Sequence, residues 1–468
     1  MDRISFGISG GLGEKEIQKI RDDAFDLLDK VGVEIEDTEI VSELKRHKGI
    51  RAEGALVFYS GEIVEEFIRQ VREQNDEYFL RVPGRDKPVI RPPYLCMRTW
   101  DLAADSARPA TVEDLQRAAK LLDTYDAEGV APIHPPDTPT RLRQMITAKT
   151  CYENSRGLGS YMPAFSVREM ELLCEMGEAA GRKWPHVSLQ VPHSPMKLDA
   201  KSLALILEMK RSKRTPRGIT AGGGAMPLSG AAAPLLLPGL LSQGLAEALS
   251  AYGTAKLLND KVGGFCSIFP ATFDMRYSGL SMASPEAVLY WLAIRQLWKE
   301  VFGQEVGGDL ACTAKTYDAQ AGAQKTAAIL TAVMSGATTF VSPGMTPTDE
   351  AFHFEGVVID MEILAYALRV GRGLAWEKTP TSDIVREGRK ERTFLVHPTT
   401  MRFREEIWDP PVFTNDSMSQ WESAGSPSVV QRAAAVARER IDQHSYRPDK
   451  PVQKDLDRIM RIAEKDLA

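Results

Sequence analysis

Four segments in the second half of the chain share one hydrophobic pattern, in which a short apolar run ends in glycines and a helical pattern follows. They span residues 217–234, 261–279, 305–322 and 337–356. Strand, loop and helix recurring at this spacing are typical of a parallel sheet covered by helices. Because such sheets carry their reacting groups in the loops after the strands, the pattern directs the search for function to those loops.

Three earlier apolar runs, at 130–136, 158–165 and 186–194, have the same character. Together with the four later segments they approach the eight strands of a closed (β/α)8 barrel. The predicted fold is therefore an α/β TIM barrel over residues 91–375. Residues 1–90, with alternating helix and strand patterns, are expected to form an N-terminal cap, and residues 376–468 a C-terminal helical extension.

Several helix boundaries follow from capping chemistry, because Ser and Thr side chains accept hydrogen bonds from the first unpaired backbone N–H groups of a helix. Helix starts are predicted at Thr111, Ser166 and Ser284. The pattern is irregular over 397–413, which is predicted to be a loop. Helical patterns near 427–443 and 452–467 follow it.

Composition excludes several classes of protein. The 58 basic and 64 acidic residues leave a formal charge of −6, and the basic residues are scattered, so there is no electrostatic footprint for nucleic acid. Hydrophobic residues make up 43% and charged residues 26%, the balance of an ordinary globular protein. The five cysteines are dispersed without a Cys-x-x-Cys pair, which argues against a disulfide framework or a zinc ribbon.

The sequence does not predict an export signal or a membrane span. The N-terminus lacks the apolar core of a signal peptide. The most apolar stretch, 231–253, is interrupted by Pro234 and Pro238, so we expect a loop followed by a buried helix there. We therefore expect a cytoplasmic protein.

Common catalytic motifs are missing. Gly222, Gly223 and Gly224 do not match the spacing of a dinucleotide-binding loop, and they are expected to let the backbone approach a substrate or a neighbouring strand. The histidines include no His-Glu-x-x-His, although His134, His193 and His353 fall near predicted strand ends. A zinc site would need distant pairing of these residues, so a structural role is favoured for each. Of these histidines, His353 is the best candidate for a functional role.

Aromatic residues gather near the same predicted loops. Ring faces attract quaternary ammonium groups, so these residues suggest a cage for an organic cation, although core packing is the usual role of any one of them. The cage candidates are Tyr94, Trp100, Phe269, Tyr317 and Phe354. Lys315 could meet a substrate carboxylate, and Asp318 is expected to cap the helix that Gln320 enters.

Several segments indicate more than a (β/α)8 barrel in general. Residues 27–37, 227–234, 274–287, 314–322 and 397–413 resemble, in order, segments of the trimethylamine methyltransferase superfamily. The resemblance runs over nearly the whole chain. It implies a (β/α)8 barrel that transfers a methyl group from a methylated amine to the cobalt of a separate corrinoid protein.

One departure from the family is visible. The archaeal trimethylamine enzymes place pyrrolysine in the barrel, whereas this sequence has only standard residues, including across 305–325. Relatives without pyrrolysine act on quaternary amines. The resemblance therefore implies that glycine betaine is demethylated to dimethylglycine, with proline betaine, carnitine or choline as alternative substrates.

The chemistry of a quaternary amine agrees with the missing acid and base motifs. Its nitrogen already carries the positive charge, so attack on one methyl group releases a neutral tertiary amine without help from an acid. The enzyme then needs mainly to hold the methyl group toward Co(I) and to exclude water. We expect no tightly bound cofactor, since cobalamin would arrive with its partner protein or free, and we expect a homo-oligomer.

These arguments define one set of site residues. His353 is the predicted catalytic residue, and it shares with Lys315 the task of meeting the substrate carboxylate. The predicted substrate-binding residues are Tyr94, Trp100, Phe269, Lys315, Tyr317, Gln320 and Phe354. Two other classes of protein stay open: a non-catalytic quaternary-amine binder, and a metal-dependent lyase or hydrolase on the same barrel.

Overall fold

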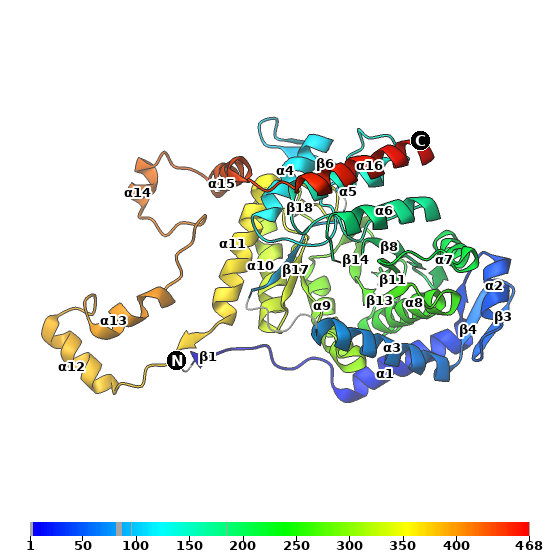
Figure 1. Cartoon of the computed structure of the whole chain (residues 1–468). Helices are drawn as coiled ribbons and strands as arrows, with labels where there is room; N and C mark the ends of the chain where they lie inside the picture. Colours follow the sequence, from blue (N-terminus) through cyan, green and yellow to red (C-terminus); the bar gives the residue numbers. More distant parts are fainter. Residues whose placement is uncertain (1–2, 81–86, 95, 184, 468) are drawn as a thin grey trace.

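The structure is a computed structural model, and it describes residues 3–80, 87–94, 96–183 and 185–467. At its centre, parallel strand segments alternate with helices along the chain (Figure 1). Two three-stranded parallel sheets make up most of them. One runs in the order β13 (Gly263–Ile268), β11 (Ile219–Ala225), β8 (Val187–Gln190), and the other in the order β16 (Gly308–Asp309), β17 (Thr339–Val341), β5 (Val89–Arg91).

Shorter contacts join the two sheets. The backbone N–H of Glu128 donates to the carbonyl of Ile90, and parallel bridges pair Gly129 with Leu158 and Met162 with Val187. These contacts insert two short segments, near 128–130 and 158–162, between β5 and β8. Eight strand segments thus follow one another side by side: β16, β17, β5, the segments near 128–130 and 158–162, β8, β11 and β13. Within the described residues, backbone contacts join each of these neighbours, and no such contact joins β13 to β16.

A helix follows each of the eight segments, as the pattern of the sequence predicts. These helices are α4 (Val112–Asp123), α5 (Arg143–Asn154), α6 (Val167–Ala179), α7 (Ala200–Ser212), α8 (Leu237–Leu258), α9 (Pro285–Phe302), α10 (Ala319–Met334) and α11 (Phe354–Gly371). The predicted starts are confirmed, since the side chains of Thr111, Ser166 and Ser284 each accept a backbone hydrogen bond as N-caps. The buried helix expected after Pro238 is α8. None of the described helices is long and apolar enough to cross a membrane.

From residue 14 onward, the N-terminal part of the chain packs beside α8. It contains β1 (Arg3–Ile4), α1 (Glu14–Asp26), a π-helical turn (Leu27–Val31), β2 (Val33–Glu34), α2 (Thr38–Leu44), β3 (Ile50–Glu53), β4 (Leu56–Tyr59) and α3 (Gly61–Leu80). Strands β2 to β4 join β9 (Pro192–His193) and β10 (Lys197–Leu198) in a sheet of order β3-β4-β2-β10-β9. The hairpin that follows β8 therefore attaches this part to the body. The predicted boundaries of the cap and of the C-terminal extension stay predictions.

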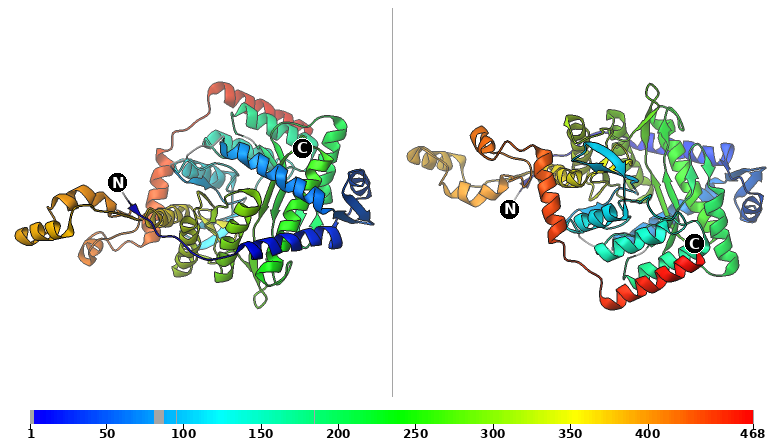
Figure 2. Two further views of the ribbon diagram at one scale, coloured as in Figure 1. Left: turned by 90° about the horizontal axis from the view of Figure 1, so that it is seen from below. Right: turned by 90° about the horizontal axis from the view of Figure 1, so that it is seen from above.

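After α11 the chain leaves the body and later returns (Figures 1 and 2). The excursion begins at β20 (Leu374–Ala375), which pairs with β1, and contains α12 (Thr381–Glu391), α13 (Pro398–Phe403), a 3-10 turn (Arg404–Glu406) and α14 (Met418–Ser423). The two predicted C-terminal helices are α15 (Val429–Gln443) and α16 (Lys450–Asp466), and they pack on the body.

The prediction of a loop over 397–413 is wrong at its start. Residues 398–403 form α13, because Pro398 occupies the first helical turn and the ring of His397 accepts a hydrogen bond from the backbone N–H of Thr399. A proline at this position needs no N–H partner and is pre-set for a helix.

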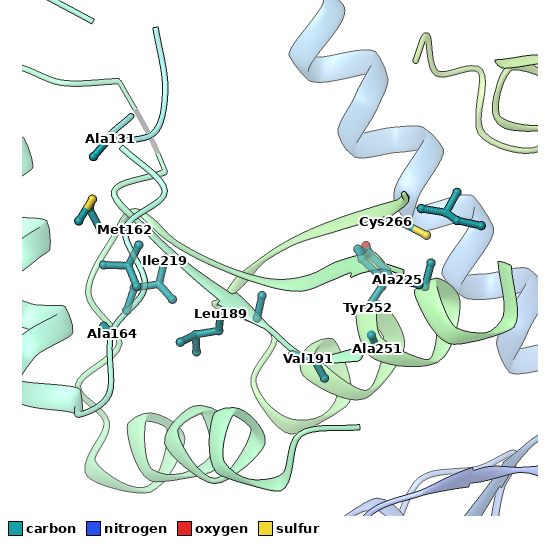
Figure 3. Packing of buried hydrophobic residues seen from close by; sticks show 14 of the residues in the cluster. Ala131, Met162, Ala164, Leu189, Val191, Ile219, Ala225, Ala251, Tyr252 and Cys266 are labelled. Carbon is teal, nitrogen blue, oxygen red and sulfur yellow. The ribbon is translucent and has the colours of Figure 1, made fainter. Parts of the chain in front are cut away.

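One large core joins the strands to the outer helices. Figure 3 shows Ala251 and Tyr252 of α8 beside Ala225 of β11 and Cys266 of β13. All four side chains are buried. A helix this evenly buried lies between two layers of structure, which explains why 231–253 reads as the most apolar stretch of the sequence.

The glycines at 222–224 lie where backbone and side chains come close together. A Cβ atom on Gly222 would lie 2.3 Å from the carbonyl oxygen of Phe265 on β13, and those on Gly223 and Gly224 would meet the rings of Pro192 and Phe269. Gly222 also has a φ of +131°. The interpretation that this run permits close approach to a neighbouring strand is therefore confirmed.

Replacing Gly222 with alanine should destabilise the protein. The positive φ alone costs about 1–3 kcal/mol for a residue with a side chain, and the overlap with Phe265 adds to it. We expect the midpoint of urea unfolding, followed by circular dichroism, to fall. Gly279→Ala is the matched strand control, because its nearest contact would be 3.9 Å away, and its midpoint should match that of the wild type. Equal midpoints for both variants would contradict the prediction.

Candidate functional site

Three aromatic rings predicted for the site meet at one place. Trp100 lies on β6 (Arg98–Asp101) in the loop region after β5, Tyr317 follows β16, and His353 follows β17. Because β16, β17 and β5 are neighbours in one parallel sheet, the loops after them emerge side by side. The ring of His353 stacks on that of Trp100 at 5.2 Å and 14°, and it meets the edge of Tyr317 at 5.2 Å.

His353 is held from both sides of its ring. Its Nε2 lies 2.5 Å from the hydroxyl of Thr346, and its Nδ1 lies 3.2 Å from a carboxylate oxygen of Glu355. A carboxylate only accepts hydrogen bonds, so the network assigns a proton to Nδ1. With 1% of its surface exposed, the imidazole forms a fixed platform for the indole of Trp100, which is only half-buried.

The buried ion pair of Lys325 and Asp360 holds Tyr317 in place. The ammonium of Lys325 lies 2.8 Å from Oδ2 of Asp360, and neither side chain has any exposed surface. The phenol of Tyr317 donates to the same oxygen at 2.8 Å, as does the backbone N–H of Gly344. Lys325 also donates to the carbonyls of Leu310 and Met345. One lysine and one aspartate therefore connect the loops after β16 and β17 to the outer helices α10 and α11.

The ionisation of this network follows from burial. Burial raises the pKa of Tyr317 well above its ordinary value, and the adjacent Asp360 carboxylate raises it further, so the phenol keeps its proton and serves as a donor. Burial also raises the pKa of Asp360, while the Lys325 ammonium and the hydrogen bonds from Gly344 and Tyr317 oppose that rise. The Lys325 ammonium lies 5.0 Å from the centroid of the Tyr317 ring, so one cation already contacts this aromatic group.

Gly356 on α11 makes room for Tyr317. A Cβ atom at this position would lie between 2.2 and 2.5 Å from three atoms of the phenol. The ring can therefore pack flat against the helix only because the residue is glycine.

The remaining predicted residues lie apart from this cluster. Tyr94 is exposed, and the ring of Phe269 meets that of Trp291 at 6.0 Å. Phe354 packs on Phe352 and under the guanidinium of Arg117. The structure thus brings together Trp100, Tyr317 and His353, whereas Tyr94 follows β5, Phe269 follows β13 and Phe354 is the first residue of α11.

Two polar candidates lie at the surface next to Tyr317. Lys315 is exposed, and its ammonium donates to the carbonyl of Thr313 at 2.8 Å. Gln320 donates to the hydroxyl of Thr313 at 3.3 Å, and Asp318 caps α10 as predicted. Lys315 and Gln320 therefore share one neighbour on the loop that carries Tyr317.

The other histidines near strand ends do not form a metal site. Burial lowers the pKa of His134 to about 4, and His193 lies in the β9–β10 hairpin, opposite Lys197. In the part of the chain that the structure describes, no three His, Cys, Asp or Glu side chains are arranged to hold a metal ion.

The ion pair of Lys325 and Asp360 was not predicted from the sequence, although the sequence contains a signal for it. Lys325 lies in the apolar stretch AGAQKTAAIL and Asp360 in GVVIDMEILA. A charged residue within an apolar helical run is rarely fully buried without a partner, so each of the two predicts an opposite charge nearby.

Substituting Gly356 with alanine should displace Tyr317 from α11. Overpacking at such a site costs about 1–3 kcal/mol, so we expect a lower urea midpoint and altered tyrosine fluorescence. Gly322→Ala on the neighbouring helix α10 is the matched control, since nothing lies within 4 Å of its new methyl group. That change should raise the midpoint or leave it unchanged, because alanine favours a helix. A Gly356 variant as stable as the Gly322 variant would refute the packing argument.

Comparisons with known proteins identify the family of the chain. The family model described as "Trimethylamine methyltransferase (MTTB)" matches residues 7–461. The chain is 24% identical over 430 residues to a glycine betaine methyltransferase of Desulfitobacterium hafniense (strain Y51), covering 88% of each chain. It is 27% identical over 293 residues to a trimethylamine methyltransferase of Methanosarcina barkeri (strain Fusaro / DSM 804), covering 62% of this chain and 58% of that one.

Among solved structures, the monomethylamine methyltransferase of Methanosarcina barkeri aligns with 99% of this chain and 96% of its own, at 12% identity and a TM-score of 0.38. The family match alone covers nearly the whole sequence, and the relatives named above are methyltransferases. The resemblance of the sequence segments is thereby confirmed, and the chain belongs to the trimethylamine methyltransferase family.

Proposed function

We propose that this protein transfers a methyl group from a quaternary amine, with glycine betaine as the preferred substrate, to the Co(I) of a cognate corrinoid protein. The observation that carries the proposal is the meeting of Trp100, Tyr317 and His353 where three neighbouring strands end. Aromatic faces attract quaternary ammonium without needing an acid or a base. The similarity to a glycine betaine methyltransferase over 88% of the chain supports the choice of substrate.

The proposal gives each residue a task. Trp100 offers a half-buried indole to the cation, and the edge of Tyr317 lies beside it. Together with His353, these rings form what we call the aromatic corner. Both ring nitrogens of His353 already have partners, which favours a positioning role for this residue over contact with the substrate carboxylate. Lys315, exposed on the loop that carries Tyr317, is the proposed carboxylate anchor, with Gln320 beside it.

The reaction needs little proton chemistry. The bond between the methyl carbon and nitrogen breaks, and its electron pair stays on nitrogen, which gives neutral dimethylglycine nitrogen without an acid. Co(I) supplies the electron pair of the new bond and becomes methyl-Co(III). The chain's own residues bind the cation, exclude water and aim one methyl group outward. The proposal also includes a closed (β/α)8 barrel, which the parallel neighbours from β16 through β5 to β13 support.

The direct test incubates purified protein with glycine betaine and free Co(I)-cobalamin. We expect the absorption spectrum to change from that of Co(I) to that of methyl-Co(III), with one dimethylglycine released per methyl group transferred. Trimethylamine, proline betaine, carnitine and choline serve as comparison substrates. A faster reaction with trimethylamine than with any quaternary amine would contradict the proposal. Betaine binding by calorimetry with no methyl transfer would support the non-catalytic binder instead.

The aromatic corner predicts the effect of one substitution. Replacing Trp100 with alanine removes a cation–π contact of about 2 kcal/mol in a desolvated site, which corresponds to a loss in kcat/KM of more than tenfold. Tyr446→Ala is the matched aromatic control, because this ring packs on Arg156 in the connection between α15 and α16. The control should keep wild-type kcat/KM. Equal activity of the Trp100 variant and the wild type would remove the indole from the proposed site.

A further inference from the structure

The segment between α11 and α15 has no core of its own. We call residues 376–404 its first limb and residues 405–428 its second limb. Helices α12, α13 and α14 have 11, 6 and 6 residues, and the single buried residue among them is Gly388. Helices this short are marginal in water without tertiary packing. The helices of both limbs therefore need a surface to pack on, whereas Val412 and Phe413 of the second limb already pack on the body.

Large apolar side chains on the limbs face solvent. Leu395, Val396 and Ile407 are 79%, 71% and 78% exposed, and Trp376, Val385, Phe394, Met401 and Met418 are also exposed. Figures 1 and 2 show the limbs projecting from one end of the molecule, opposite the sheet that contains β3 and β4. Exposed apolar residues gathered in one part of a molecule are typical of an interaction site.

The two limbs carry opposite charge. The first limb has seven basic and four acidic residues, whereas the second has five acidic residues and no basic one. Some of these charges are used within the chain, as in Arg386 with Asp383 and Glu406 with Arg3. Arg389, Lys390, Asp416 and Glu422 are exposed, and the ion pairs of the described residues do not include them.

The geometry points to a second copy of this chain as the occupant: we propose that two copies associate about a two-fold axis, the basic first limb of each lying on the acidic second limb of the other. A two-fold interface brings one surface patch onto its equivalent, so a patch with a basic half and an acidic half is complementary to itself. The exposed apolar side chains on the same limbs would form the interior of that interface.

Several contacts attach the start of the second limb, at Glu406 and Trp408, to the body. Glu406 forms ion pairs with Arg3, Arg369 and Arg372, and Trp408 packs edge-on against Tyr366 of α11 at 5.3 Å. The limbs are thereby presented by a fixed base, which suits a lasting interface between copies.

Charge reversal tests the pairing in solution. A basic-limb variant (Arg389→Glu with Lys390→Glu) and an acidic-limb variant (Asp416→Lys with Glu422→Lys) would each place like charges opposite each other. We expect the full-length wild type to sediment as a dimer or a multiple of it, and each variant to associate at least tenfold more weakly. Mixed in equal amounts, the two variants should regain wild-type association, because each limb then meets an opposite charge. Lys48→Glu, next to β3 at the opposite end of the molecule from the limbs, is the matched control.

A wild type that sediments as a monomer would overturn the proposal. So would variants that associate like the wild type, or a mixture of the two variants that stays monomeric. A separate measurement on the wild type avoids any effect of substitution on folding. After carbodiimide cross-linking of mixed light and heavy nitrogen-labelled chains, we expect Lys390 joined to Asp416 or Glu422 in peptides that combine both labels. If these cross-links occur only within one label, the limbs pair inside a single chain and the proposal is wrong.

Discussion

The buried pair of Lys325 and Asp360 is the interaction on which the candidate site depends. Two opposite charges without solvent contact are stable only when each is fully engaged, and removal of one partner costs about 3–5 kcal/mol. Here the lysine satisfies two loop carbonyls, and the aspartate accepts from a backbone amide and from Tyr317. The pair thus fixes the position of the Tyr317 ring relative to the outer helices α10 and α11. Without it, the loops after β16 and β17 would lose their shared attachment to α10 and α11, and hydrogen bonds from Thr346 to Lys315 and from Thr348 to Cys312 would be left to join them.

Such preorganisation would suit the proposed reaction, in which few groups take part in catalysis. A quaternary amine has no proton to lose at nitrogen and needs none to leave, so an acid at the site would contribute little. What an enzyme can do is bind the cation in one orientation and keep water away from the methyl group under attack. A stacked Trp100 and His353 with Tyr317 at the edge provides a fixed aromatic corner, and a fixed corner loses less entropy on binding than a mobile one.

Much of the fold could be predicted from the sequence, because its signals are local. Strand runs ending in glycine, polar helix caps and the buried helix α8 each follow from a few adjacent residues. The site was only partly predictable. Trp100, Tyr317 and His353 lie on loops distant in sequence, and their meeting depends on the order of β16, β17 and β5 in the sheet. The short helix α13 was missed because one proline and one histidine cap decide it within an irregular stretch.

Helix α11 links the two parts of the molecule that carry proposals. Its first turn follows His353 and contains Glu355 and Gly356, which hold the histidine and admit Tyr317. Its last turns carry Arg369, and Arg372 follows directly, both paired with Glu406 at the base of the limbs. A rigid helix transmits displacement along its axis, because its packed neighbours leave it little room to bend. An interface built on the limbs would therefore restrain the same helix that positions the aromatic corner, so association and the geometry of the site share one structural element.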